Sequence, residues 1–304
     1  MQRRELIEKI NKLKKEKNAI ILAHTYQNVE IDEVADFSGD SLYLSQQAAK
    51  TDADVIVFAG VYFMAETAKI LSPKKTVLLP NLNAGCAMAD KINVEQLRNF
   101  KAQHPDIPVV CYVNSTAAVK AESDICCTSA NAVNVVKSLN KKEVLFVPDQ
   151  HLGSYVESQL DGVKVITYSG FCPVHHEINP SDIVEKKTLY PEAKVMVHPE
   201  CPDEVVKMAD YTGSTTGIIK TVKESSDKEF IIVTEKGVVE RLERDCPDKK
   251  FVLINEKAVC ETMKLIHLED ILNTLENNVY EINIDEEISN KAINAINKMV
   301  MINA

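Results

Sequence analysis

The sequence predicts an α/β fold in which one strand–helix unit is used three times along 304 residues. The first observation is a repeat of cysteines: Cys86, Cys172 and Cys260 each end a polar loop, and they lie 86 and 88 residues apart. Self-similarity at a fixed period is the signature of a repeated supersecondary unit. The second observation is that short apolar runs alternate with helical runs throughout. This alternation favours parallel sheets covered by helices, joined by right-handed crossovers.

Two further landmarks keep the same period. The first apolar run of each unit ends in a polar or aromatic residue, and these residues are His24, Tyr112 and His198. A hydroxyl stands 17 residues after each of them, at Ser41, Ser129 and Thr215. Three landmarks in phase across three copies indicate true repetition rather than chance.

The first unit opens with an amphipathic helix that turns Leu6, Ile10 and Leu13 inward. The run AIILAH at 19–24 shows no alternation, which suits a strand buried on both faces. The remaining elements expected here are a helical stretch at 31–50 broken at Ser38–Ser41, a strand at 55–60, a helix at 62–71 and a strand at 76–80.

The second and third units repeat this order after a helix around 91–104. In the second we expect strands at 108–113, 143–149 and 164–169, a short strand or turn at 124–127, and helices at 116–123, 129–140 and 151–160. In the third we expect strands at 194–200, 229–234 and 250–255, and helices at 202–209, 217–225 and 237–245. A tail of helix 261–277, strand 279–284 and helix 286–301 lacks the landmarks.

The period divides the chain into four segments. Residues 1–87, 88–174 and 175–262 are the three repeats, and residues 263–304 are a C-terminal extension expected to pack back on the first repeat.

Composition excludes several classes of function. The net charge is −10, and no basic stripe interleaved with aromatics appears, which argues against nucleic-acid binding. The longest apolar run, 55–65, falls short of the roughly 20 residues that span a bilayer. The N-terminus lacks the apolar core of a signal peptide. We therefore expect a cytoplasmic protein, in whose reducing surroundings cysteines serve metals or catalysis more often than disulfides.

Ligands of parallel sheets gather outside the carboxyl ends of the strands, where all of these landmarks fall. If the units surround a pseudo-threefold axis, Cys86, Cys172 and Cys260 can meet at its centre. Three thiolates suit either a [4Fe-4S] cluster with one open iron or Zn²⁺ with an open position. The alternative is that a cysteine is a small buried hydrophobe. We favour that alternative for the cysteines that break the period, which are Cys111, Cys126, Cys127, Cys201 and Cys246.

The hydroxyls Ser41, Ser129 and Thr215 are expected at helix starts, where backbone N–H groups attract anions. They therefore predict a small, multiply anionic substrate, although each could simply cap its helix. The histidines at strand ends could likewise be structural. His175 and His176 follow Cys172 closely and are candidate partners behind it.

With these residues in place, the sequence resembles the quinolinate synthase (NadA) family over essentially the whole chain. The motifs that carry the resemblance are AHTYQ (23–27), DFSGDSL (36–42), GVYFMAETAKIL (60–71), NAGCAMAD (83–90), YVNSTAAVKA (112–121), CTSANA (127–132), PDQHLG (148–153), GFCPVHHEI (170–178), VHPEC (197–201), GSTTGI (213–218) and NEKAVC (255–260). The resemblance implies three homologous three-layer αβα sandwich domains around a pseudo-threefold axis, with the active site at the centre. It also implies a [4Fe-4S] cluster held by Cys86, Cys172 and Cys260, with one open iron acting as a Lewis acid.

The reaction implied is a transferase reaction of NAD biosynthesis. Iminoaspartate condenses with dihydroxyacetone phosphate to give quinolinate, phosphate and two waters, and the enzyme that produces iminoaspartate is a possible functional partner. By motif position, the substrate-binding residues are His24, Ser41, Tyr112, Val113, Asn114, Ser129, His198, Pro199, Glu200 and Thr215. The catalytic candidates are Tyr26, Glu200 and His24. Beside an electron-rich cluster and a dianionic substrate, the pKa of Glu200 is expected to be raised, as suits a general base.

One departure from the family pattern stands at the third cysteine. Some relatives carry a C-x-x-C-x-x-C run there, whereas this chain reads Cys260-Glu-Thr-Met. The redox disulfide attributed to that run is therefore not expected in this chain.

Three readings from other classes remain open at this point. A solute-binding or sensor protein would leave the phased cysteines unexplained. A zinc hydrolase would use the three cysteines as ligands and Glu200 as base, and an iron–sulfur redox sensor would need no anion site.

Overall fold

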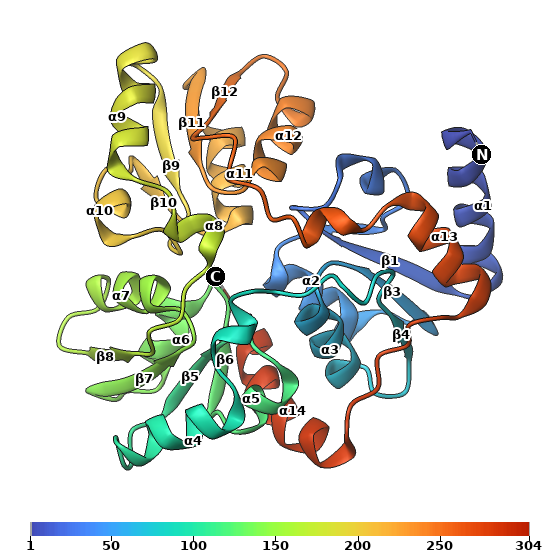
Figure 1. Ribbon diagram of the computed structural model, residues 1–304, viewed down its shortest axis with the longest axis horizontal. Coiled ribbons are helices and arrows are strands. Elements are labelled where there is room, and N and C mark those ends of the chain that lie inside the picture. Colours follow the sequence, from blue (N-terminus) through green and yellow to red (C-terminus); the bar gives the residue numbers. More distant parts are fainter. Residues whose placement is uncertain (1, 304) are drawn as a thin grey trace.

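The computed structural model describes residues 2–303 and contains three four-stranded sheets, all parallel. The strand orders β2-β1-β3-β4, β6-β5-β7-β8 and β10-β9-β11-β12 are the same pattern three times. Figure 1 shows the three lobes arranged around a common centre. The predicted fold class is confirmed.

In the first repeat the order of elements is α1 (Arg3–Glu16), β1 (Ala19–His24), η1 (Val29–Glu33), β2 (Phe37–Gly39), α2 (Ser41–Lys50), β3 (Val55–Ala59), α3 (Tyr62–Leu71) and β4 (Thr76–Leu78). The helix expected over 31–50 is therefore wrong in its first half, where a 3-10 turn and an edge strand form. The reason is a contact with β1. The Asp36 carboxylate accepts the N–H of Ile21 at 2.8 Å, and the Asp36 N–H donates to the Ile21 carbonyl at 2.9 Å.

The same hydrogen bond, from a strand N–H to an aspartate carboxylate, recurs in the other repeats. Asp124 accepts the N–H of Val109 at 2.7 Å, and Asp210 accepts the N–H of Val195 at 2.8 Å. In each case a buried-strand N–H is paired by a carboxylate 15 residues further on, and the chain after that carboxylate becomes the edge strand.

The second repeat contains η2 (Ala89–Lys91), α4 (Val94–Ala102), β5 (Val109–Tyr112), α5 (Ala117–Ala121), β6 (Ile125–Cys127), α6 (Ala132–Ser138), β7 (Glu143–Val147), α7 (Gln150–Ser158) and β8 (Lys164–Thr167). The third contains α8 (Pro173–His176), α9 (Pro180–Leu189), β9 (Lys194–Val197), α10 (Asp203–Val206), β10 (Tyr211–Thr212), α11 (Thr215–Glu224), β11 (Glu229–Val233), α12 (Lys236–Asp245) and β12 (Lys250–Leu253). The helices α8 and α9 were not among the predicted elements. The helix expected at 129–140 begins only at Ala132, which leaves Ser129 in the preceding turn.

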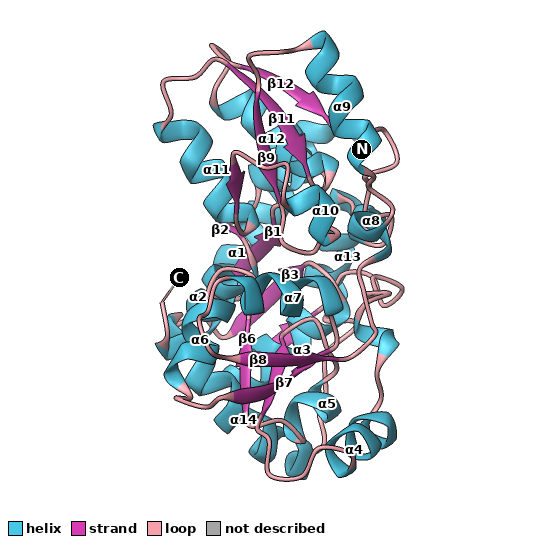
Figure 2. Ribbon diagram, turned by 90° about the vertical axis from the view of Figure 1, so that its left-hand side faces the viewer, coloured by secondary structure: helices cyan, strands magenta, loops and turns pink. Residues whose placement is uncertain are grey.

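The third repeat shows the three layers most clearly. One apolar core packs Ile183 of α9 and Val205 of α10 against Val195 and Ile231 of the sheet. A separate core on the other face packs α11 and α12 against the alternate strand residues, such as Ile232. Figure 2 shows the strands of this repeat between these two sets of helices.

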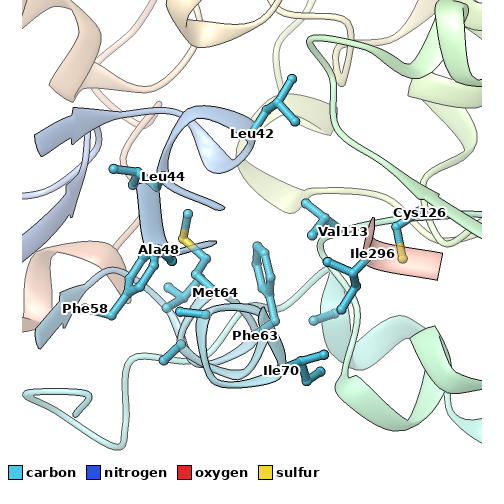
Figure 3. Packing of buried hydrophobic residues seen from close by; sticks show 14 of the residues in the cluster. Leu42, Leu44, Ala48, Phe58, Phe63, Met64, Ile70, Val113, Cys126 and Ile296 are labelled. Atoms are coloured by element: carbon cyan, nitrogen blue, oxygen red, sulfur yellow. The ribbon is translucent and has the colours of Figure 1, made fainter. Parts of the chain in front are cut away.

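The C-terminal segment continues with η3 (Met263–Leu265), α13 (Leu268–Asn277) and α14 (Glu286–Met301). The helix α13 packs on α1, whereas α14 contacts α5 and β6 of the second repeat as well as α3 of the first. Figure 3 shows Ile296 of α14 beside Val113 and Cys126. The strand expected at 279–284 is wrong, because only an isolated antiparallel bridge joins Glu281 to Leu78. Within residues 2–303, no helix combines the length and apolar character needed to cross a membrane.

Candidate active site

A cavity of about 300 Å³ lies where the three repeats meet. The predicted residues that line it come from all three repeats, and they are His24, Tyr26, Ser41, Cys86, Tyr112, Asn114, Ser129, Cys172, His198, Glu200, Thr215 and Cys260. Two predicted substrate-binding residues, Val113 and Pro199, are not among the lining residues. Val113 packs its side chain into the apolar core, as Figure 3 shows.

The three cysteine loops are built alike. In each, the carbonyl two residues before the cysteine accepts the N–H of the first residue of a helix, at 2.8 Å. The pairs are Tyr62 to Ala84, Gln150 to Gly170 and Lys236 to Ala258. Each cysteine is thereby held at the same point of its repeat, beside the carboxyl ends of the strands.

The three cysteines are partly buried and lie close enough to raise one another's pKa. Burial raises the pKa of Cys86 to about 12, and Cys260 adds to the rise. Burial also raises the pKa of Cys172, to which Glu200, Cys86 and Cys260 contribute. Thiolates are costly in such surroundings unless a positive group neutralises them. The cavity is therefore suited to a cationic group bound by thiolates.

The spacing of the sulfurs favours a group larger than one ion. Zn²⁺ binds sulfur at about 2.3 Å, so its tetrahedral ligands lie about 3.8 Å apart. In residues 2–303, the trio whose ligand atoms all lie within 4.8 Å of one another is Cys172, His175 and Glu200, not the three cysteines. The three thiols fit an iron–sulfur cluster better than a zinc ion held by all three. The other five cysteines are buried in the core, as predicted.

Glu200 occupies the centre of the hydrogen-bond network and is 4% exposed. It accepts the hydroxyl of Tyr112 at 2.5 Å and lies 2.9 Å from Nδ1 of His175. Burial alone would raise the pKa of Glu200, but His198, His175 and Tyr112 outweigh it and lower the pKa to about 2. The expected raised pKa is therefore wrong, because Tyr112 of the second repeat and His175 and His198 of the third stabilise the carboxylate.

His24 and His198 share one geometry. Nδ1 of His24 accepts the N–H of Tyr26 at 3.1 Å, and Nδ1 of His198 accepts the N–H of Glu200 at 3.3 Å. Burial lowers the pKa of both rings to about 3, so both are neutral near pH 7. A neutral ring whose Nδ1 accepts carries its proton on Nε2, which makes each histidine a donor.

Tyr26 is buried among hydroxyls. Its Oη accepts from Thr215 at 3.1 Å and lies 3.1 Å from Oγ1 of Thr234. Burial raises the pKa of Tyr26, and the charge of Glu200 raises it further. The phenol therefore stays protonated and is suited to donating rather than accepting a proton.

Neither Ser41 nor Thr215 is the N-cap of its helix. The cap of α2 is Asp40, which accepts the N–H of Tyr43 at 3.0 Å, and Ser41 is the first helical residue. The cap of α11 is Ser214, which accepts the N–H of Gly217 at 3.2 Å, and Thr215 follows it. Capping therefore does not account for Ser41 or Thr215. Both line the cavity, where the Ser41 hydroxyl can meet an anion and the Thr215 hydroxyl donates to Tyr26.

Two residues of the site were missed from the sequence. Thr234 bonds both Tyr26 and His175, and Glu235 accepts the backbone N–H of Cys260 at 3.2 Å. The sequence could have indicated both residues, because they follow the end of β11. Glu235 also lies 86 residues after Asp149, which is one period of the repeat.

The fold and the cavity define a class, namely α/β proteins of three repeated domains that share one thiol-lined central site. Comparison with known proteins names the family within that class. The sequence profile described as Quinolinate synthetase A protein matches residues 8–301.

Individual relatives agree over almost the full length. A protein from Alkaliphilus metalliredigens named Quinolinate synthase is 51% identical over 302 residues, which cover 99% of this chain and 100% of the relative. Quinolinate synthase 2 of Methanosarcina acetivorans is 54% identical over 302 residues, covering 99% and 97% of the two chains. Quinolinate synthase of Dehalococcoides mccartyi strain CBDB1 is 54% identical over 300 residues, covering 98% and 99%. The chain belongs to the quinolinate synthetase A protein family.

Proposed function

We propose that this chain is a quinolinate synthase, a transferase that condenses iminoaspartate with dihydroxyacetone phosphate in de novo NAD biosynthesis. Phosphate and two waters would leave as the pyridine ring closes. The observation that carries the proposal is one buried cavity lined both by the three phased cysteines and by neutral hydrogen-bond donors. The family relationship supports the proposal, because the relatives are named quinolinate synthase.

The three cysteines would hold a [4Fe-4S] cluster, with one iron left without a protein ligand. When bound, the cluster would supply a Lewis-acidic position for a hydroxyl or carboxylate oxygen. Its binding to Cys86, Cys172 and Cys260 is supported by their common loop geometry and by the spread of their sulfurs.

The carboxylates of iminoaspartate would be bound by hydrogen-bond donors that line the same cavity. These are Nε2–H of His24 and His198, the hydroxyls of Ser41, Ser129 and Thr215, and the side chains of Tyr112 and Asn114. Val113 and Pro199 would contribute through their backbone. Asn114 Oδ1 is buried without a hydrogen-bond partner in the described part of the chain, so it can accept the imine or amine N–H of the substrate.

Glu200 and Tyr26 would move the protons. Glu200 is ionised near pH 7, so it can accept a proton from a carbon or nitrogen of the substrate. Tyr26 keeps its proton and can deliver it to a departing hydroxyl. His24, which contacts the Tyr26 backbone, would orient both the substrate and the phenol.

Iminoaspartate would come from a partner enzyme that produces it, and we place both in the cytoplasm. The substrates are small anions, and neither nucleic acid nor a membrane would take part.

The test is an anaerobic absorption spectrum with iron and sulfide counts, for the parent and for Cys86→Ala, Cys172→Ala and Cys260→Ala. Cys246→Ala, outside the cavity, is the matched control. A broad band near ~400 nm with about four irons, lost in each of the three variants and kept in the control, is expected. A parent that folds but takes up no iron and sulfide on reconstitution would overturn the cluster assignment.

The reaction is tested separately by following quinolinate formation from the two substrates. Glu200→Gln should lose turnover while it keeps its iron and sulfide. If that variant keeps full turnover with an intact cluster, Glu200 is no base.

A further inference from the structure

Three side chains in the cavity form a donor set that differs from the three cysteines. Nδ1 of His175 lies 3.2 Å from Sγ of Cys172 and 2.9 Å from Oε2 of Glu200. All three ligand atoms lie within 4.8 Å of one another. The imidazole and the carboxylate are almost fully buried, and Cys172 is partly buried.

The two distances from Nδ1 of His175 are close to the edges of a metal tetrahedron. With Zn²⁺ at about 2.3 Å from sulfur and about 2.0 Å from nitrogen or oxygen, the ligand atoms of a tetrahedral site lie about 3.3–3.5 Å apart. Nδ1 of His175 therefore needs to move from its two neighbours by only a few tenths of an ångström. A metal ion can take the place that a proton now holds between these atoms.

The hydrogen bond at the other ring nitrogen of His175 is compatible with a metal ion on Nδ1. Nε2 of His175 lies 2.8 Å from the hydroxyl of Thr234, which can donate or accept. Without a metal, Nδ1–H serves Glu200 and the ring accepts from Thr234. With a metal on Nδ1, the proton sits on Nε2 and Thr234 accepts it, the usual support of a metal-bound histidine.

The charges also balance. One thiolate, one carboxylate and one neutral imidazole together carry −2, which a divalent ion neutralises inside the protein. Mixed sulfur, nitrogen and carboxylate ligands suit ions of borderline softness.

We propose that the chain without its cluster binds one divalent transition-metal ion, such as Zn²⁺, Fe²⁺ or Co²⁺, at Cys172, His175 and Glu200. Binding releases the thiol proton, moves the imidazole proton to Nε2 and involves no electron transfer. Because Cys172 would serve both groups, the single ion and the cluster exclude each other.

The direct test is an anaerobic titration of the full-length, cluster-free chain with Co²⁺. One equivalent should bind, with a thiolate-to-cobalt band in the near ultraviolet and visible bands of tetrahedral intensity. Zn²⁺ should displace it. Cys172→Ala should lose the thiolate band, and His175→Ala or Glu200→Gln should weaken binding by at least about tenfold.

Cys86→Ala and Cys260→Ala are the decisive controls, since both thiols line the same cavity. Both should keep the cobalt site unchanged. If either abolishes the thiolate band, the ion is held by the three cysteines and the proposal fails. It also fails if the folded parent shows no thiolate band. Thermal unfolding checks each variant, and His175→Gln replaces His175→Ala if the smaller side chain prevents folding.

Mutual exclusion is tested by loading the parent with one equivalent of Zn²⁺ before iron and sulfide are supplied. Zn²⁺ should slow iron uptake by the parent markedly. It should slow iron uptake by His175→Ala much less, because that variant lacks one ligand of the proposed zinc site. Uptake at the same rate with and without Zn²⁺ would overturn the exclusion. The cobalt titration uses neither substrate nor cluster, so its failure is distinguishable from failure of the proposed reaction.

Discussion

The loops that carry Cys86, Cys172 and Cys260 all lead into a helix that opens with a capping box seven residues after the cysteine, but the turn between differs after Cys172. After Cys86 and Cys260 the chain forms a 3-10 turn, η2 or η3, and then a longer helix that opens with a capping box. After Cys172, Pro173 starts the short helix α8 at once in place of the 3-10 turn, and α9 then opens with a capping box of its own. The approach to each cysteine and the start of the following helix are common to all three repeats, and the turn between them is not.

The difference changes the chemistry of one position. Three residues beyond the cysteine stand Ala89 and Met263 in the two similar loops, but His175 in the third. This imidazole contacts both Cys172 and Glu200. Repetition therefore supplies three equivalent thiols, and one departure from repetition supplies an asymmetric group for proton chemistry or metal binding.

Removing the asymmetric residue should have the largest effect. His175→Ala should lower kcat by about 100-fold or more while iron and sulfide stay at parental levels, because Glu200 loses a donor and its orientation. Met263→Leu, at the equivalent position of the third loop, should keep parental turnover. An intact cluster with parental kcat would show that His175 is only a packing residue.

The pH profile of the same variant sharpens the comparison. Glu200 acts as a carboxylate, so activity falls as pH drops through its pKa, which its neighbours lower to about 2. Loss of His175 raises that pKa, so the acid limb of kcat/KM should move to higher pH. A profile that overlays that of the parent would contradict this.

The anchor of the Cys260 loop comes next. Glu235 is fully buried and accepts the N–H groups of Gly237 at 2.6 Å and Cys260 at 3.2 Å. Glu235→Ala leaves both donors unpaired and should cost about 1–3 kcal/mol for each in the free energy of unfolding. Glu235→Gln keeps an acceptor oxygen and should cost less. Chemical denaturation of the cluster-free proteins measures both, and equal losses would show that hydrogen bonding is not the cause.

A smaller effect is expected where the Cys172 loop passes over the second repeat. A Cβ on Gly170 would lie 2.4 Å from the Pro148 carbonyl oxygen, whereas one on Gly85 meets its nearest atom at 4.0 Å. Gly170→Ala should therefore destabilise the protein by about 1–3 kcal/mol, as overpacking does. Gly85→Ala should be tolerated. Thermal unfolding of the Gly170→Ala and Gly85→Ala variants measures the difference. Equal stabilities of the two variants would contradict the close approach of Gly170 to Pro148.

The smallest effect concerns the capping box of α4. Asn93 accepts the N–H of Gln96 at 2.9 Å, and the Gln96 side chain accepts the N–H of Asn93 at 2.9 Å. Asn93→Ala should cost about 1 kcal/mol. Asn99→Ala, exposed on the same helix, should be neutral or slightly stabilising, because alanine favours helices. A loss in Asn99→Ala equal to that in Asn93→Ala would mean that the cap contributes nothing.

The sequence by itself determined the threefold repetition, the three α/β sheets and the positions of the cysteine loops. These features are periodic, and a period can be read without knowing any distance. It also placed His24, Tyr112 and His198 at strand ends, and Ser41 and Thr215 at helix starts, beside the cavity, whereas Ser129 lines the cavity from the turn before α6.

Only the tertiary structure decided what depends on contacts between segments distant in the sequence. The edge strand β2 forms because Asp36 pairs with Ile21 on β1, which local helical propensity cannot reveal. The pKa of Glu200 is lowered rather than raised because Tyr112, 88 residues away, and His175 donate to it. A pKa depends on the distances and directions of donors, and these exist only once the three repeats have closed around the cavity.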